Sequence, residues 1–372
     1  MRIVSHGILN RGEPGTNRAV STFPSLTPLA DGSLLALYRV GSTKDCDDER
    51  LELRRSTDAG HTWSEPARPF STTLGGAIGS LKVGYMTEIE AGRLLLAAMW
   101  IDRETYPGQP LFNEETEGAL PIKLVLSDSF DKGNSWSPWR PLPSAPELGP
   151  PSLTNPILKL PSGRLALSIE TNKHYEDSGP WRQRVVYLYS DDQGDSWSEP
   201  LTVSQDPTGR IFNWDQRAGL DERGRLATFS WTYDRQTNTY LNVHRRISVD
   251  EGASWTEAED LGFADQASHP AILSDGRVVM AWVDRFGSRS IRARVADAVD
   301  QRFEADTEVE IYRLADAAPT GPGRQTGDLL AQMGLWNFGL PFAAALPDDD
   351  ALVVYYAGDA QNMWVRWVRL AP

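Results

Sequence analysis

Ser56-Thr57-Asp58-Ala59-Gly60-His61-Thr62-Trp63 is the stretch that decides the fold, because its pattern Ser-x-Asp-x-Gly-x-Ser/Thr-Trp occurs three more times in the chain. The other copies begin at Ser129, Ser190 and Ser248, and successive aspartates lie 58 to 73 residues apart. A short pattern that returns at such intervals indicates a repeat protein, in which each copy belongs to one structural unit.

Each copy has the chemistry of a tight turn. Ser and Asp side chains accept hydrogen bonds from nearby backbone, Gly adopts a positive φ, and Trp anchors the turn on an apolar layer. Runs typical of strands come before the turns; residues 184–189, for example, are rich in branched and aromatic side chains. We therefore predict that the four patterns are corners that join neighbouring β-strands.

A second repeated turn lies earlier in each unit, where a glycine separates two apolar runs. It occurs at Gly32, Gly92, Gly163, Gly224 and Gly276, and residues 348–356 are a weaker sixth copy without the glycine. Six such units predict an all-β fold, a six-bladed β-propeller of four-stranded antiparallel blades. We expect residues 1–372 to form this single domain, closed by a strand at residues 2–4 that pairs beside residues 363–368 of the last blade.

The repeated turns resemble the Asp-boxes of the sialidase superfamily, and residues 23–26, 31–35 and 53–58 resemble the first blade of that family. The resemblance covers nearly the whole chain and implies a six-bladed propeller that acts on glycosides. It places the arginine and the acid/base aspartate of the family's first blade on Arg39 and Asp45.

The sequence also departs from that family. Thr22 and His269 stand where the resemblance implies arginines that hold the substrate carboxylate, and residues 337–339 contain no nucleophilic tyrosine. We therefore expect a sialidase-like protein that is not a true sialidase.

Composition and charge narrow the choice of partners. The net charge is −14, which disfavours nucleic acid and anionic membranes because an acidic surface repels both. Cys46 is the single cysteine, so no intramolecular disulfide can form, and residues 1–7 lack the apolar stretch of a signal peptide. We expect a cytoplasmic protein; the sequence does not determine its oligomeric state.

Metal and cofactor motifs are not evident in the sequence. The five histidines never occur at the spacing of zinc ligands, and no Gly-rich phosphate-binding motif is present. We expect no cofactor and no metal, and we interpret the acidic residues 45–49 as a solvated loop; the sequence does not decide whether calcium binds there.

Propeller geometry indicates where a site would lie. Inner strands begin and second strands end on one face of the disc, whereas the Asp-box turns lie on the other, so functional residues are expected at those strand ends. Arginines there would bind a carboxylate, aromatic rings would face a sugar, and paired acids would supply general acid and nucleophile or base. The catalytic candidates are Asp45, Glu170, Asp215 and His269. The substrate-binding candidates are Arg39, Asn155, Trp214, Arg217, Tyr233, Asp284, Arg285 and Tyr356.

Several of these candidates also have structural interpretations. Glu170 follows the apolar residues 165–169, so burial would raise its pKa as an acid catalyst requires, or it would pair with Lys173. His269 precedes Pro270 and points toward the axis, either as a catalyst or as a hydrogen-bonding side chain.

The most direct interpretation is an exo-acting glycoside hydrolase for an acidic or highly hydroxylated sugar, which uses paired carboxylates and arginines. Two alternatives stay open: a polysaccharide lyase that uses His269, and a propeller that binds a glycan or a protein without catalysis. Two carboxyl groups in a deep axial cleft would favour the enzyme, and a shallow mouth of ion-paired charges would favour the binding protein.

Overall fold

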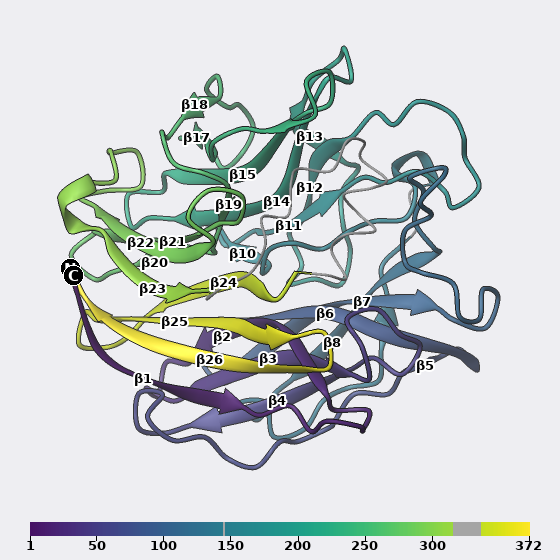
Figure 1. Cartoon of the computed structure of the whole chain (residues 1–372), viewed down its shortest axis with the longest axis horizontal. Coiled ribbons are helices and arrows are strands. Elements are labelled where there is room, and N and C mark those ends of the chain that lie inside the picture. Colours follow the sequence, from purple (N-terminus) through teal and green to yellow (C-terminus); the bar gives the residue numbers. More distant parts are fainter. Residues whose placement is uncertain (144–145, 315–335) are drawn as a thin grey trace.

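The computed structural model describes residues 1–143, 146–314 and 336–372, and nearly all regular structure in these ranges is β-strand (Figure 1). Two short 3-10 turns, η1 (Pro146–Leu148) and η2 (Ala305–Thr307), are the helical elements of the described residues. The predictions of an all-β chain and of a propeller-like arrangement of small antiparallel sheets are confirmed.

The described strands form five hydrogen-bonded sheets. The first sheet contains β1 (Arg2–Asn10), β2 (Val20–Pro28), β3 (Leu34–Gly41), β4 (Arg50–Ser56), β24 (Phe338–Ala345), β25 (Ala351–Asp359) and β26 (Asn362–Ala371). The second contains β5 (Thr73–Leu74), β6 (Ala77–Glu90), β7 (Arg93–Asp102), β8 (Ile122–Ser129) and β9 (Arg140–Pro141). The third contains β10 (Leu158–Lys159), β11 (Leu165–Glu170), β12 (Arg184–Ser190) and β13 (Leu201–Gln205). The fourth contains β14 (Ile211–Leu220), β15 (Leu226–Asp234), β16 (Thr239–Tyr240), β17 (His244–Ser248) and β18 (Glu259–Asp260). The fifth contains β19 (Gln266–Ala267), β20 (Ala271–Ile272), β21 (Val278–Asp284), β22 (Ser290–Ala296) and β23 (Val309–Arg313).

The hydrogen bonds do not divide the described strands into the six separate four-stranded blades that the sequence predicts. Four sheets, of four or five strands each, stand apart as blades, and the remaining strands form one seven-stranded sheet. The reason is a single parallel pair between Val20 of β2 and Met363 of β26, which joins the first strands of the chain to the last.

The two ends of the chain meet in this seven-stranded sheet. β1 pairs antiparallel with β26, with Arg2 opposite Ala371 and Ile8 opposite Arg366 (Figure 1, purple beside yellow). The termini consequently lie together at one edge of the molecule.

The Asp-box turns have the structure that their residues predict. In the first, Ser56 Oγ accepts the N–H of Gly60 at 2.9 Å, and Asp58 Oδ1 accepts the N–H of Thr62 at 2.9 Å. Gly60 has a φ of +87°, and a Cβ there would lie 2.6 Å from Leu352 Cδ2. The position therefore requires glycine for its conformation and for its packing.

The Asp-box tryptophans pack against the apolar clusters between the sheets, but they are half-buried rather than enclosed. The middle strands supply the fully buried layers: every residue of β3 and of β11 is buried. A strand that is covered on both faces reads as a continuous apolar run, and a charged residue at its end is then held out of water with it. Glu170 is in this position at the end of β11.

Candidate functional site

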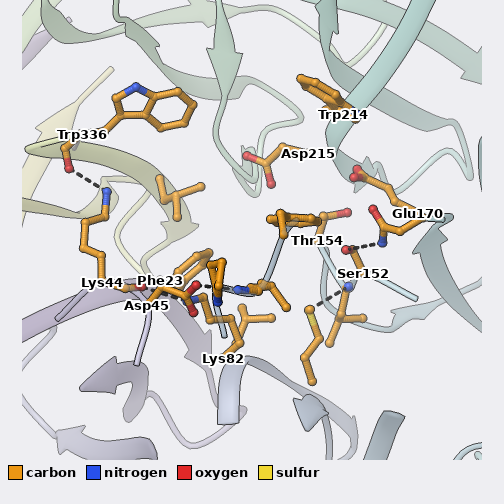
Figure 2. A pocket seen from close by; sticks show the side chains of 18 of the residues that line it. Phe23, Lys44, Asp45, Lys82, Ser152, Thr154, Glu170, Trp214, Asp215 and Trp336 are labelled. Carbon is orange, nitrogen blue, oxygen red and sulfur yellow. Dashed lines mark hydrogen bonds and ion pairs between the residues drawn. The ribbon is translucent and has the colours of Figure 1, made fainter. Parts of the chain in front are cut away.

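A cavity of about 620 Å³ lies where the strand ends of several sheets converge (Figure 2). Its volume falls within the roughly 300–1,000 Å³ of small-molecule sites. Figure 2 shows Glu170 and Trp214 on one side of it, with Lys44 and Asp45 on the other. Among the described residues, its lining contains no Asp-box residue.

Glu170 contributes a buried carboxyl group to the cavity wall. The side chain is at the end of β11, and its Oε1 accepts the N–H of Gln216 at 2.8 Å. Burial, and then the nearby charge of Asp215, raises the pKa of Glu170 to about 8. Glu170 is therefore protonated at neutral pH and can donate a proton.

Asp215 contributes the second carboxyl group on the same wall. A β-bulge in β14 shifts the pairing between Trp214 and Arg217, and Asp215 there has a φ of +44°. Bulges commonly redirect a side chain, and this one directs Asp215 to the cavity. Its Oδ1 pairs with Arg217 Nη2 at 2.7 Å, and its Oδ2 accepts Gln266 Nε2 at 2.6 Å.

Arg217 supports Asp215 from behind rather than lining the cavity. It is 2 % exposed, and its Nη1 donates to the Tyr85 hydroxyl at 2.8 Å and to the carbonyl oxygen of Thr154. Asp215 is thus ion-paired with Arg217 and lies beside the protonated Glu170. A protonated carboxyl group beside a second carboxyl group that is held by an arginine is an arrangement that can divide acid and base roles.

Aromatic side chains form another part of the cavity wall: Phe112, Trp181, Trp214, Trp231 and Trp336. They belong to one aromatic cluster, in which the Trp231 and Trp336 ring centroids are 5.4 Å apart. Such rings present a rigid apolar surface, which suits the face of a sugar ring or of an aromatic group.

Arg285 and Lys44 give the cavity a positively charged end. Arg285 lies 4.0 Å over the ring of Trp336 and donates to Phe338 O and to Gln266 Oε1, which are neutral acceptors. Lys44 Nζ donates to Trp336 O at 2.6 Å and to the Tyr356 hydroxyl at 3.2 Å. Burial, and then the charge of Arg285, holds the pKa of Lys44 well below its usual range. An anionic ligand group placed here would pair with Arg285 and would favour the charged form of Lys44, which burial and Arg285 otherwise disfavour.

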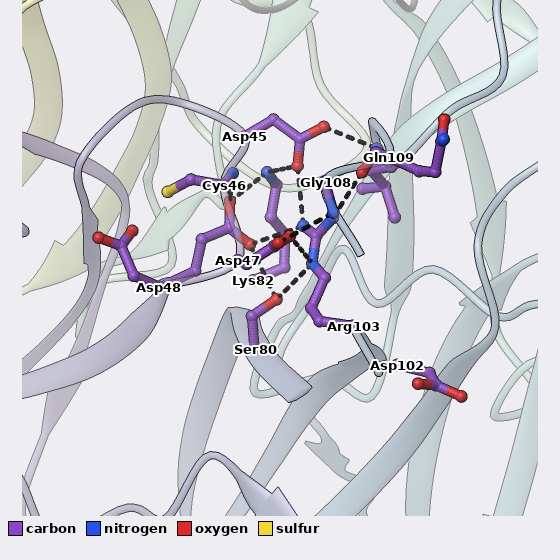
Figure 3. Close-up of polar contacts among 12 residues, drawn as sticks. Asp45, Cys46, Asp47, Asp48, Ser80, Lys82, Asp102, Arg103, Gly108 and Gln109 are labelled. Carbon is purple, nitrogen blue, oxygen red and sulfur yellow. Dashed lines mark hydrogen bonds and ion pairs between the residues drawn. The ribbon is translucent and has the colours of Figure 1, made fainter. Parts of the chain in front are cut away.

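Asp45 lies at the edge of the cavity within an ion-pair network (Figure 3). Its Oδ1 accepts Arg103 Nη2 at 2.9 Å and Lys82 Nζ at 3.1 Å, and its Oδ2 accepts the N–H of Leu111 at 2.6 Å. Burial would raise the pKa of Asp45, but the charges of Lys82 and Arg103 outweigh it and hold the pKa well below its usual range. Asp45 is thus a permanent anion in this structure.

Arg39 belongs to the base of the same network and not to the cavity lining. It is fully buried and pairs with Glu49, which also accepts Lys82 Nζ at 2.6 Å. The resemblance implied that Arg39 contacts substrate, whereas its place in the structure is that of a buried partner for Glu49.

Four other candidates lie outside the cavity lining. Asn155 Oδ1 accepts the N–H of Ala218, and Asp284 accepts the N–H groups of its own loop. Tyr233 stacks behind Trp214, with ring centroids 5.5 Å apart. His269 stacks on Phe342 at 4.4 Å, and burial lowers its pKa to about 4. Trp214, Arg285 and Tyr356, by contrast, line the cavity together with the acids Asp45, Glu170 and Asp215.

Sequence reasoning missed several residues of the cavity. Lys82 could have been found from the sequence, because a charged residue in the middle of the apolar strand β6 is unusual and indicates a buried ion pair or a site. Gln266, which links Arg285 to Asp215, starts the short strand β19 and carried no signal. Asp265 beside it is a fully buried acid whose pKa burial raises to about 7.

Metal and membrane features are not found in the described residues. No group of three or more His, Cys, Asp or Glu side chains is arranged there to hold a metal ion. In the same part of the chain, no helix has the length and apolar composition needed to cross a bilayer.

Comparison with known proteins gives a match to one family model. Residues 111–299 match the family model of the BNR repeat-like domain. No curated protein matches the chain by sequence.

Three solved structures have a similar fold. A protein of unknown function from Dyadobacter fermentans is 20% identical with a TM-score of 0.70, and the match covers 100% of this chain and 99% of that one. An intramolecular trans-sialidase from leech is 13% identical with a TM-score of 0.68, over 99% of this chain and 70% of its own. The intramolecular trans-sialidase from Ruminococcus gnavus is 13% identical with a TM-score of 0.66, over 100% of this chain and 98% of its own. At these identities the similarity shows the fold.

Proposed function

This chain belongs to the BNR repeat-like domain family, and on that premise we propose that it is a sialidase-like glycoside hydrolase that acts on the end of a glycan bearing an acidic or highly hydroxylated sugar. The observation that carries the proposal is the pair Glu170 and Asp215 in the cavity lining, of which Glu170 is protonated and Asp215 is ion-paired with Arg217. Fold similarity to sialidases supports the reaction class but not the substrate.

The chemistry follows from these two carboxyl groups. Glu170 donates its proton to the glycosidic oxygen as the bond from that oxygen to the anomeric carbon breaks. Asp215 either attacks the anomeric carbon, which gives a glycosyl ester that water then hydrolyses with the deprotonated Glu170 as base, or takes a proton from the water that attacks the anomeric carbon directly; in both cases the products are the free sugar and an alcohol. The ion pair with Arg217 and the hydrogen bond from Gln266 fix the direction of the Asp215 carboxylate.

The positively charged end of the cavity suits an acidic sugar. A carboxylate or sulfate placed between Arg285 and Lys44 would pair with the Arg285 guanidinium and accept a hydrogen bond from Lys44, while the rings of Trp231 and Trp336 pack against the sugar. Because Asp45 is already paired with two cations, we assign no proton transfer to it.

The experiment is a hydrolysis screen of 4-methylumbelliferyl glycosides that includes uronides, sialosides and neutral hexosides. The proposal expects turnover of an acidic glycoside that is lost in Glu170→Gln and kept in Glu257→Gln, an exposed glutamate far from the cavity in sequence. Turnover that Glu170→Gln retains, or no turnover of any glycoside, would contradict it.

The binding alternative is favoured by one observation, the ion-paired charges of Asp45, Lys82 and Arg103 at the cavity edge. It would show as glycan affinity in calorimetry with no released product. The lyase alternative has no support in the geometry, because His269 stacks on Phe342 outside the described cavity lining.

A further inference from the structure

The loop between β7 and β8 forms part of the cavity wall, and hydrogen bonds and an ion pair hold both of its ends against other loops. Residues 104–118 are here called the rim segment; within it, Gly108 to Phe112 and Glu114 line the cavity. The rim segment lies between Asp102, where β7 ends, and Ile122, where β8 begins. It contains no strand; backbone hydrogen bonds within the loop between β7 and β8, such as that from Leu120 N–H to Leu111 O at 2.9 Å, and contacts from other loops hold it in place.

The first group of contacts that hold the rim segment comes from the loop after β3. Asp45 Oδ2 accepts the N–H of Leu111 at 2.6 Å, and Asp47 Oδ2 accepts the N–H of Gly108 at 3.0 Å. Arg103 completes the contact, because it donates to Gln109 O at 3.0 Å and to Asp45 Oδ1 at 2.9 Å (Figure 3). One carboxylate therefore holds both the backbone of the rim segment and the arginine beside it.

The second group of contacts that hold the rim segment comes from the loops after β11 and β15. Asn113 Nδ2 donates to Tyr175 O at 3.1 Å, and the N–H of Ala119, next to the rim segment, donates to Lys173 O at 2.9 Å. Glu117 pairs with Arg235 Nη2 at 2.6 Å. The rim segment thus connects its own sheet to loops of three other sheets along one side of the cavity.

From these contacts we infer that the rim segment determines which ligands the cavity admits, and that Asp45 is its positioning residue rather than a catalytic acid. A cavity closed along one side takes the end of a glycan, whereas a groove open along that side would also admit the middle of a chain. The selectivity part of this inference rests on the proposed function; the positioning role of Asp45 does not.

The first test measures the position of the rim segment without any substrate. Amide hydrogen exchange of the full chain is compared for wild type, Asp45→Ala and Asp45→Asn. Asp45→Ala removes both accepting oxygens, so exchange of the amides of residues 108, 109, 111 and 112 should speed up at least tenfold. Asp45→Asn keeps one oxygen for the N–H of Leu111 and should restore part of the protection.

Two further variants keep the test decisive. Asp206→Asn is the matched control, because Asp206 also fixes a loop by accepting backbone N–H groups, among them that of Ile211 at 2.7 Å, and its loop does not line the cavity. It should leave exchange in the rim segment unchanged. If Asp45→Ala does not fold, Glu117→Gln loosens the other end and should speed exchange of residues 113–118. Unchanged exchange in both rim variants would overturn the inference.

The second test uses the glycoside found in the hydrolysis screen and a polymer with the same sugar inside its chain. Asp45→Asn should raise KM about tenfold with kcat within threefold of wild type, and Asp45→Ala should begin to cleave internal linkages. If Asp45→Asn instead loses kcat as Glu170→Gln does, while the rim segment stays protected, Asp45 is a catalytic acid and the inference fails. If wild type cleaves no glycoside, the proposed function fails, and the exchange experiment still decides the role of Asp45.

Discussion

Glu170 is buried and His269 is half-buried, and removal from water shifts the pKa values of these two groups in opposite directions. Removal from water disfavours the charged form of each group, so the pKa of Glu170 rises to about 8 and that of His269 falls to about 4. Both are consequently neutral at pH 7. Only Glu170 also lines the cavity, and only Glu170 can donate a proton to a ligand there.

Replacement of Glu170 by Gln should lower kcat about a hundredfold or more, because general acid catalysis typically contributes 10²–10⁴. KM should change little, since the amide has nearly the same shape. In wild type, kcat should fall as the pH rises through about 8, where Glu170 loses its proton. Steady-state kinetics between pH 5 and 10 measure both effects, and a wild-type kcat that stays constant up to pH 10 would remove Glu170 from the acid role.

The same substitution should make the protein more stable at alkaline pH. The unfolded chain ionises Glu170 near pH 4.5, whereas the folded protein keeps it protonated to about pH 8. Between these values the folded state binds more protons, so the free energy of unfolding decreases as the pH rises. Gln cannot ionise. The free energy of unfolding of Glu170→Gln relative to that of wild type should therefore be about 2–5 kcal/mol larger at pH 8.5 than at pH 4.5. Urea unfolding at the two pH values tests this; an equal difference at both would show that Glu170 is not buried as described.

At the scale of the element, the Asp-box is a turn whose hydrogen bonds depend on one buried serine. Ser129 is 1 % exposed, accepts the N–H of Gly133 at 2.8 Å and donates to Asp131 Oδ1 at 2.9 Å. Ser129→Ala leaves the buried N–H of Gly133 without its partner, which should cost about 1–3 kcal/mol.

Thermal or urea unfolding measures that cost. Glycoside turnover at a temperature where the variant is folded should equal that of wild type, because Asp-box residues lie outside the cavity lining. Ser135→Ala is a milder comparison, since it removes only the hydrogen bond to Asp131 from an exposed hydroxyl. A large loss of turnover in folded Ser129→Ala protein would contradict the separation of turn and site.

The turns could be predicted from sequence because each one depends on neighbouring residues. The hydrogen bonds of the first turn join Ser56 to Gly60 and Asp58 to Thr62, all within one short segment. The sequence pattern alone therefore determines the conformation of the turn. The bulge at Asp215 could not be predicted in this way, because it depends on how β14 pairs with β15 and on contacts from Gln266.

The same distinction applies to the candidate site. The expectation that second strands end at the site places Glu170 and Arg285 in the cavity, because the end of a strand has a defined position on the disc. Strand position does not give the direction of a side chain, however. Arg39, at a comparable place in β3, points into the buried network with Glu49 instead.

At the scale of the whole molecule, the first and last strands of the chain meet in one sheet, and we expect the stability of the fold to depend on this pairing. β1 contributes the buried Leu9, and Gly7 lies against the indole of Trp367, where a Cβ would be 2.7 Å from Trp367 Cε2. β1 covers β26 along its length from Arg2 opposite Ala371 to Asn10 opposite Val365. Without β1, this side of β26 would expose its backbone and the buried part of Trp367 to water.

A variant that lacks residues 2–10 should therefore lose stability without losing the site. The deleted pairing and burial amount to on the order of 5 kcal/mol, and the loss should appear in urea unfolding followed by tryptophan fluorescence. No residue of β1 lines the cavity among the described residues, so affinity for the glycoside selected in the screen, measured by calorimetry at low temperature, should match wild type. A matched variant, Gly7→Val, should destabilise less, because it pushes Trp367 aside but keeps the strand. If the deletion unfolds with the stability of wild type, closure does not depend on β1, and the sheet is held by the Val20–Met363 pair and the packing of β2 instead.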